Sequence, residues 1–386
     1  MTRIGATVLT CLLSAPLAAG RPVMAEGAER PADVRAVPFS ALEGWAGDDL
    51  GAALEPFRRS CAAAATGRSR VSPPAELASV CRAVPADPTE ARSFLESRFK
   101  AYEVPAQGFL TGYYEPEFAG AMERSEAFPV PLLARPADLV PVPVEARPAG
   151  FPAELSAARR TGDGLQPYPD RAAIEDGALR DEARPVVFLK DAVDAFVVHV
   201  QGSAAIRLPD GQMLRVAYDG RNGHPYTSVA RLLRARLAVP AEDLTADKLA
   251  AWLRAHPEEA RELLRANRSY IFFRIAAELR PDEGPLGAAG VPLTAGRSLA
   301  IDSSLWPYGV PAWIEAEVAR PEGGTERLRR LAIVQDTGSA ITGPARADLF
   351  VGTGPEAGAR AGVVRAPLRV VILWPEADAA PPPSSP

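Results

Sequence analysis

The sequence predicts a mainly β protein with accessory α-helices, and three observations carry this prediction. Proline and glycine make up about 18% of the 386 residues and separate short apolar runs, which is typical of many strands and turns. Helical periodicity is confined to the segment before residue 104 and to the segment 229–264. The stretches 104–220 and 290–375 instead alternate short apolar runs with turn residues, which favours strands.

The first 25 residues match an export signal. Arg3 precedes an apolar run from Ile4 to Gly20, and Val23-Met24-Ala25 ends in a small-x-small cleavage pattern. A membrane-spanning helix is the alternative, but the run is short and contains Pro16. Cys11 invites lipid attachment, yet a threonine stands where a lipidation motif has a small residue. We therefore expect an exported protein, periplasmic with outer-membrane association left open, and not anchored by lipid.

The segment from residue 40 to 102 predicts helices. Ser40 and Glu43 match an S-x-x-E capping box. Asp87 predicts an N-cap, with Pro88 in the first turn of a further helix. Apolar residues recur at helical spacing between these signals: Leu50, Leu54, Phe57 and Cys61.

The composition excludes several classes of function. A net charge of −5 is too acidic for a nucleic-acid binder that must neutralise phosphates. Three cysteines and three histidines cannot supply a zinc finger, and we expect no cofactor. After export only Cys61 and Cys81 would remain, and two readings stay open. They form a disulfide worth about 3 kcal/mol in loop entropy, or they are two buried free thiols.

The middle and end of the chain carry clear element signals. Ile206–Val216 around Asp210-Gly211 predicts a β-hairpin. Helices are expected over 229–237 and 245–253, and from His256-Pro257 to Leu264. The best strand candidates are 311–318, 328–335 and 368–374, and a Pro/Ser-rich tail within 376–386 is expected to be disordered.

Three stretches concentrate groups that can carry chemistry. The segments 200–203 and 218–226 hold amides, hydroxyls and phenols beside glycines, which suits sugar binding, although polar hairpin turns explain them equally well. In 108–117 two tyrosines follow a glycine, and core tyrosines are the alternative. Asp302, Asp336 and Asp348 lie beside apolar strands, where burial would raise a carboxyl pKa and suit a general acid. Turn aspartates are the alternative for this set.

Taken together, these stretches resemble the membrane-bound lytic transglycosylase A family, which cleaves peptidoglycan, with its C-terminal three-aspartate domain. The resemblance covers roughly 70% of the chain, between about 105 and 375. The matching blocks are Phe109–Tyr114 (FLTGYY), Val200–Ser203 (VQGS), Asn222–His224 (NGH), Asn267–Phe273 (NRSYIFF), Val291–Asp302 (VPLTAGRSLAID) and Asp336–Gly362 (DTGSAITGPARADLFVGTGPEAGARAG).

The resemblance implies a double-psi β-barrel domain, an inserted second β-rich domain, and a substrate groove between them. It places the barrel domain with its N-terminal helices in 26–115 and 285–386, and the insert in 116–284. Asp348 would be the general acid/base, with Asp336 and Asp302 supporting it. The residues implied for substrate binding are Thr111, Gly112, Tyr113, Tyr114, Gln201, Gly202, Ser203, Asn222, Gly223 and His224.

The implied activity is non-hydrolytic cleavage between N-acetylmuramic acid and N-acetylglucosamine, giving 1,6-anhydromuramoyl ends without metal or organic cofactor. One carboxyl can suffice because the attacking hydroxyl belongs to the substrate and has a high effective molarity. A hydrolytic β-glycanase and a non-catalytic cell-wall-binding protein are the alternatives. Expected partners are peptidoglycan strands and wall-synthesis or division proteins, and no nucleic acid; we expect a monomer.

Overall fold

The structure is a computed structural model of the chain. It describes residues 33–66, 75–143, 147–240, 244, 246–280, 283–338 and 341–376. The expected export signal and nearly all of the expected disordered tail lie outside these residues. Contacts divide the described chain into two units. The insert unit is Glu117–Ala277, and the barrel unit comprises the described residues up to Pro116 and from Glu278 onward. The resemblance implied nearby boundaries, at 116 and 284.

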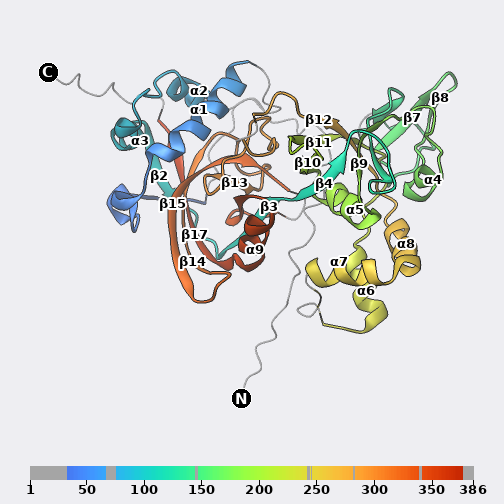
Figure 1. The fold of residues 1–386 in the computed structure, drawn as a ribbon. Coiled ribbons are helices and arrows are strands. Elements are labelled where there is room, and N and C mark those ends of the chain that lie inside the picture. Colours follow the sequence, from blue (N-terminus) through green and yellow to red (C-terminus); the bar gives the residue numbers. More distant parts are fainter. Residues whose placement is uncertain are drawn as a thin grey trace. The chain divides into compact units, whose positions relative to one another are not determined.

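Six strands of the barrel unit close on themselves (Figure 1). Their order is β17-β14-β15-β13-β16-β3, and β3 pairs back to β17. Two neighbouring pairs, β13–β15 and β16–β3, are parallel and the others are antiparallel. This is the expected double-psi barrel. The strands are β3 (Gly108–Glu115), β13 (Ser298–Ile301), β14 (Pro311–Ala319), β15 (Thr325–Asp336), β16 (Arg346–Thr353) and β17 (Arg365–Pro375).

Side-chain alternation decides which residues fill the barrel and which face outward. On β16, Ala347 and Leu349 belong to the interior cluster, so Arg346 and Asp348 point to the outer face. Leu110 of β3 is likewise interior. Two further strands, β1 (Arg35–Val37) and β2 (Phe99–Glu103), continue the sheet from β17. The expected strands at 311–318, 328–335 and 368–374 are thus confirmed as β14, β15 and β17.

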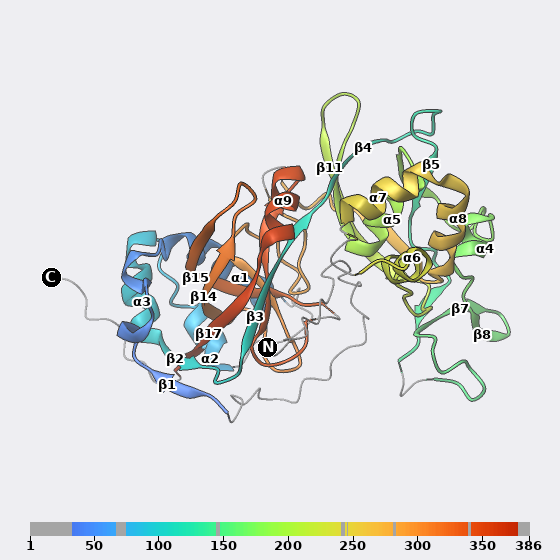
Figure 2. The ribbon, with the colours of Figure 1, turned by 90° about the horizontal axis from the view of Figure 1, so that it is seen from below.

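The N-terminal helices cover part of the barrel's outer face. Trp313, Leu331 and Val371 of the strands share one apolar cluster with these helices, and Figure 1 shows them beside β2 and β15. A further helix, α9 (Pro355–Val363), contacts β3 and β16 and runs beside β3 in Figure 2. The N-terminal elements are η1 (Phe39–Ala41), η2 (Trp45–Gly47), α1 (Gly51–Ala65), α2 (Ala75–Cys81), η3 (Pro88–Glu90) and α3 (Ala91–Arg98).

The expected capping box is wrong. Ser40 lies inside the short η1 turn, and Gly44 follows at φ +85°, a left-handed conformation that interrupts any helix there. Glu43 instead forms an ion pair with Arg329, at 2.7 Å. The second signal is confirmed, because the Asp87 side chain accepts a hydrogen bond from the Thr89 N–H at the start of η3.

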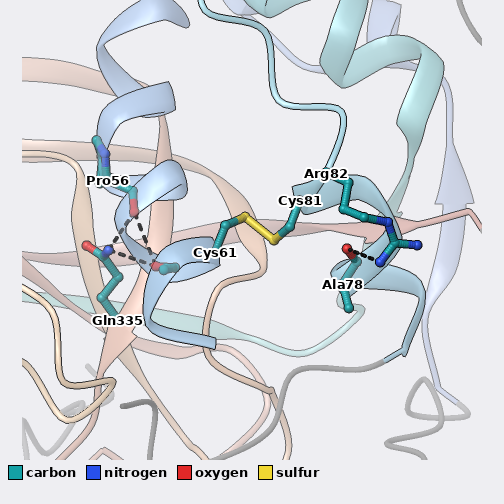
Figure 3. Close-up of a disulfide and its surroundings, with 7 residues drawn as sticks. Pro56, Cys61, Ala78, Cys81, Arg82 and Gln335 are labelled. Carbon is teal, nitrogen blue, oxygen red and sulfur yellow. Dashed lines mark hydrogen bonds between the residues drawn. A yellow bond between two sulfur atoms is a disulfide. The ribbon is translucent and has the colours of Figure 1, made fainter. Parts of the chain in front are cut away.

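Cys61 and Cys81 form a disulfide that joins α1 to α2 (Figure 3). Beside it, the buried Gln335 amide donates to the Pro56 carbonyl at 2.8 Å and to Ser60 Oγ at 2.9 Å. Gln335 is the penultimate residue of β15. The disulfide-linked helix pair is therefore hydrogen-bonded to the end of the strand that carries Asp336.

The insert unit contains two sheets and its own helices. The larger sheet has the order β12-β11-β10-β4-β9-β5 and the smaller the order β6-β7-β8. The expected hairpin is confirmed as β10 and β11, and the three expected helices as α6, α7 and α8. Two helices, α4 and α5, lie where we expected mainly strands. Strand bounds are β4 (Glu117–Ala121), β5 (Val130–Leu133), β6 (Leu139–Pro141), β7 (Ala157–Thr161), β8 (Gly164–Pro167), β9 (Pro185–Leu189), β10 (Ser203–Arg207), β11 (Met213–Arg221) and β12 (Ile271–Ile275). Helix bounds are α4 (Arg171–Glu175), α5 (Ala192–Gln201), α6 (Val229–Leu237), α7 (Ala246–Ala255) and α8 (Pro257–Ala266).

Candidate active site

Sheet register brings residues from three distant segments into one row on the barrel. Asp336 of β15 pairs with Ala300 of β13, and Ala300 pairs with Asp348 of β16. Asp348 in turn pairs with Thr111 of β3. Neighbouring strands are about 4.8 Å apart, so the two aspartates lie about 10 Å apart along the row at the backbone. The barrel thus gathers two acids and a hydroxyl on adjoining strands.

Asp348 is a buried carboxyl with an unused oxygen. Its exposed fraction is 5%, and among the described residues its Oδ1 has no hydrogen-bond partner. Burial raises its pKa to about 6, and the negative charge of Asp336 acts in the same direction. A hydrogen bond from the Thr111 hydroxyl and the charge of Arg346 lower it in part. A carboxyl with this pKa can give and take a proton near neutral pH.

Asp336 is held by two donors from other elements. The Tyr113 hydroxyl donates to its Oδ2 at 2.8 Å, and the Ala288 N–H donates to its Oδ1 at 2.9 Å. Burial raises the pKa of Asp336, while these two bonds and one from the Thr337 N–H lower it. Burial and the adjacent carboxylate raise the pKa of Tyr113 well above its ordinary value, so its hydroxyl keeps its proton. Asp336 is therefore held in place as a hydrogen-bond acceptor, and its charge acts on Asp348.

Asp302 ties two loops together. Its Oδ1 accepts from the Ser304 N–H at 3.0 Å and from the Ser304 hydroxyl at 2.6 Å. Its Oδ2 accepts from the Gly343 N–H at 2.8 Å. Gly343 lies three residues before β16, which carries Asp348. These donors come from its own turn and from the loop before β16, so Asp302 helps to fix the approach to β16.

The TGYY block divides between the two faces of β3. Thr111 and Tyr113 face outward, toward Asp348 and Asp336. Gly112 and Tyr114 face α9: a Cβ on Gly112 would lie 3.0 Å from Val364 Cβ, and the Tyr114 ring packs against Gly358. Half of this expected substrate-binding block therefore reaches the acids, and the other half packs the helix.

The NGH block is buried and mostly hydrogen-bonded within the insert unit. Asn222 has 0% exposure, its amide donates to the Pro169 and Arg268 carbonyls, and its oxygen accepts from the Tyr270 N–H. The Nε2 of His224 lies 2.8 Å from the Tyr168 carbonyl oxygen. The Nδ1 of His224 has no hydrogen-bond partner among the described residues, but the residue is only 3% exposed. Burial therefore leaves these two side chains little surface for a sugar.

The two glycines of the insert blocks are required by the backbone conformation. Gly223 has φ +86°, and a Cβ there would lie 2.3 Å from the Ala157 nitrogen. Gly202 ends α5 in the left-handed conformation, at φ +78°. Its neighbours Gln201 and Ser203 are partly exposed. Of the expected insert residues, these two keep exposed side-chain surface that a ligand can reach.

Arg346 and Gln335 are neighbours of the candidate site that the sequence did not single out. Arg346 Nη2 donates to Thr111 Oγ1 at 2.7 Å, and its charge acts on Asp348. Strand alternation supplied a signal for Arg346, because residues two apart on a strand share a face. Gln335 carried no such signal, since its partners Pro56 and Ser60 are about 280 residues earlier in the chain.

Comparison with known proteins gives matches along most of the chain. The family model described as the MltA specific insert domain matches residues 109–274, and that of the 3D domain matches 297–374. The curated membrane-bound lytic murein transglycosylase A of Vibrio cholerae is 36% identical over 200 residues, which is 50% of this chain and 52% of that protein. The chain therefore matches about half the length of this curated relative.

Two solved structures align over nearly their whole length. E. coli MltA with bound chitohexaose gives a TM-score of 0.61 at 25% identity, covering 92% of this chain and 96% of that one. The membrane-bound lytic murein transglycosylase from Agrobacterium tumefaciens gives a TM-score of 0.75 at 34% identity, covering 89% and 98%. With this identity over almost all of the Agrobacterium chain, and with the barrel and its row of acids in place, the protein belongs to the membrane-bound lytic murein transglycosylase A family.

Proposed function

We propose that this protein is a lytic transglycosylase that cleaves peptidoglycan between N-acetylmuramic acid and N-acetylglucosamine. The observation that carries the proposal is Asp348: a buried carboxyl with a pKa of about 6 and one oxygen without a hydrogen-bond partner among the described residues. Family membership supports the substrate class, since the matched relatives bear the name murein transglycosylase.

The reaction needs one group that acts first as an acid and then as a base. Protonated Asp348 gives its proton to the glycosidic oxygen as the bond from muramoyl C1 to that oxygen breaks, and the N-acetylglucosamine end leaves as an alcohol. The Asp348 carboxylate then removes the proton from the muramoyl C6 hydroxyl as that oxygen bonds to C1. The product is a 1,6-anhydro ring, Asp348 is protonated again, and no water is consumed.

The neighbouring groups keep Asp348 in this dual role. The charge of Asp336 raises the Asp348 pKa, while Thr111 and Arg346 prevent it from rising further. Tyr113 and the Ala288 N–H hold Asp336 in place. Asp302 acts at longer range by fixing the loop before β16. In the insert unit, Gln201 and Ser203 are the candidates for sugar contacts, and we assign Asn222, Gly223 and His224 to the architecture of that unit.

The test is mass spectrometry of the products released from purified peptidoglycan sacculi. We expect the wild-type protein to release muropeptides lighter by one water than hydrolysis products, and Asp348→Asn to release none. Asp163→Asn is the matched control, because Asp163 is exposed in the β7–β8 turn, and it should behave as wild type. Hydrated products would instead indicate a hydrolase, and binding of sacculi without any release would indicate a wall-binding protein.

Export to the periplasm belongs to the same proposal. It is supported by the pattern of residues 1–25 and by the disulfide, since disulfides persist in oxidising compartments. Within the described residues, no helix combines the length and the apolar character needed to cross a bilayer. Fractionation of cells expressing the full chain, with alkaline extraction of the membrane pellet, separates periplasmic protein from protein held at the outer membrane.

A further inference from the structure

An aromatic ring flanked by two arginines lies on the same barrel face as Asp348. Phe109 of β3 is 37% exposed, unusual for so large an apolar side chain. The guanidinium carbon of Arg346 lies 5.7 Å from its ring centroid, and that of Arg365 lies 5.9 Å from it. Arg365 is exposed. Arg346 is half-buried and donates to Thr111 Oγ1 and to the Phe109 and Ala347 carbonyls. The ring therefore lies between one exposed cation and one half-buried cation.

Strand register fixes the position of this group relative to the acid. Arg346 and Asp348 are two residues apart on β16, so they share the outer face at a spacing of about 7 Å. Phe109 of β3 pairs with Arg346 of β16. Thr111 of β3 pairs with Asp348 of β16 on one side and with Arg365 of β17 on the other. A sugar whose bond is cleaved at Asp348 therefore has its substituents within reach of the ring and the two cations.

The Phe109 ring and the two arginines together suit an anion that is attached to an apolar chain. Guanidinium groups bind carboxylates through paired N–H donors, and an exposed ring favours apolar atoms next to that anion. The muramoyl residue of peptidoglycan carries a lactyl ether on O3, extended by a stem peptide with free carboxylates. N-acetylglucosamine carries neither. The two arginines therefore match the substituent that distinguishes the muramoyl residue.

We propose that Phe109, Arg346 and Arg365 form a subsite for a carboxylate on the muramoyl O3 substituent, a proposal that rests on the proposed transglycosylase function. Arg346 also bonds Thr111 Oγ1 and the Phe109 carbonyl, at 2.7 and 3.4 Å. It links the subsite to the acid: a carboxylate bound here neutralises part of the charge that lowers the Asp348 pKa. Strands bearing the substituent are therefore preferred over unsubstituted glycans.

The test compares three ligands in an Asp348→Asn background, which prevents turnover during titration. The ligands are soluble peptide-bearing glycan strands, the same strands stripped of peptide by an amidase, and chitohexaose. Arg365→Gln should weaken binding of peptide-bearing strands about threefold to fivefold, as expected for one exposed ion pair, and leave chitohexaose binding unchanged. Arg365→Lys should recover part of the loss, and added salt should reduce the difference between variants.

The control is Arg327→Gln, because Arg327 is exposed on β15 nine residues before Asp336. It should bind all three ligands as the background protein does. Weakening for peptide-bearing strands alone assigns the carboxylate to the stem peptide. Weakening for stripped strands too means that the subsite also accepts the lactyl carboxylate, which is bound in an amide in peptide-bearing strands and is freed by the amidase. Equal weakening for chitohexaose, or no weakening for any ligand, would overturn the subsite. The product assay and the binding assay give independent results. A wild-type protein that releases no anhydro product would refute the transglycosylase activity, and the effect of Arg365→Gln on binding could still be measured.

Discussion

The raised pKa of Asp348 suits proton transfer but lowers the stability of the fold at neutral pH. Its pKa is about 6 in the fold and near 3.8 in the unfolded chain, so the folded state binds more protons between these values. Stability therefore falls as pH rises from about 4 to about 6 and stays low above that range. At neutral pH the fold carries an ionised carboxyl in a site that favours the neutral form.

We expect Asp348→Asn to unfold at a higher temperature than wild type at about pH 7.5, by roughly 5 °C or about 2 kcal/mol. The gain should shrink at about pH 5, where the wild-type carboxyl is already mostly protonated. Thermal melts at the two pH values measure this, with Asp163→Asn as an unaffected control. An equal gain at both pH values, or none at about pH 7.5, would refute the assigned pKa.

Tyr113 controls the same equilibrium through Asp336. Its hydroxyl lowers the Asp336 pKa, so Tyr113→Phe should raise it and leave Asp336 less charged at a given pH. The Asp348 pKa, which that charge raises, should then fall. We expect the descending limb of the kcat/KM profile, which follows protonated Asp348, to move toward lower pH, with about a tenfold loss of rate above the limb for each unit moved.

The matched control for this prediction is Tyr114→Phe, since Tyr114 packs on Gly358 on the other face of β3. It should leave the profile in place. If both variants move the limb equally, the effect does not pass through Asp336.

The individual site residues were only partly predictable from sequence. Apolar flanks correctly indicated the direction of the Asp348 pKa, but the choice of Asp348 over Asp336 came from the family resemblance. The Tyr113–Asp336 bond joins residues 223 positions apart, and no local pattern encodes such a contact. Asn222 shows the ambiguity of such patterns: an amide beside glycines suits both a ligand and a buried backbone turn, and here the amide donates to two backbone carbonyls.

At the scale of elements, the disulfide is expected to stabilise the helices that support β15. It closes a segment with a sequence separation of 20 between Cys61 and Cys81, which corresponds to about 3 kcal/mol of loop entropy. Gln335 joins this helix pair to the strand end that carries Asp336. Chemical unfolding with and without a reductant should show a loss of that size in the free energy of unfolding.

The double variant Cys61→Ser/Cys81→Ser should reproduce the reduced protein and be insensitive to reductant. If the reduced and oxidised proteins unfold at the same denaturant concentration, the bridge adds nothing to stability, and the hydrogen bonds of Gln335 together with the apolar cluster are enough to hold α1 against β15.

Secondary-structure elements were easier to predict from the sequence than site residues, where a short local motif determines the turn or the helix start. Asp210-Gly211 encodes the β10–β11 turn because the turn needs a residue at positive φ, and Gly211 has φ +86°. Asp87 was likewise predicted as an N-cap, and it caps η3 in the structure. The Ser40–Glu43 pattern failed because a glycine at positive φ and a distant arginine compete with the cap, and neither the conformation nor the pairing is visible in a four-residue motif.

At the scale of the whole molecule, topology is the part that sequence patterns did not supply. The barrel closes only when β3, from before the insert, pairs with β16 and β17 from the other end of the chain. Parallel pairs such as β16–β3 join segments far apart in sequence, and local hydrophobic periodicity carries no information on which partner a strand takes. The closed barrel was reached through the family resemblance.

Among the described residues, each of five apolar core clusters lies wholly within one unit, and this predicts two separable unfolding transitions. Leu328 belongs to the barrel interior and Leu189 to the main sheet core of the insert unit. A buried Leu→Ala change removes about 2–5 kcal/mol. Differential scanning calorimetry should show Leu328→Ala lowering one transition and Leu189→Ala lowering the other. A single transition that both variants lower equally would mean that the two cores unfold as one cooperative unit.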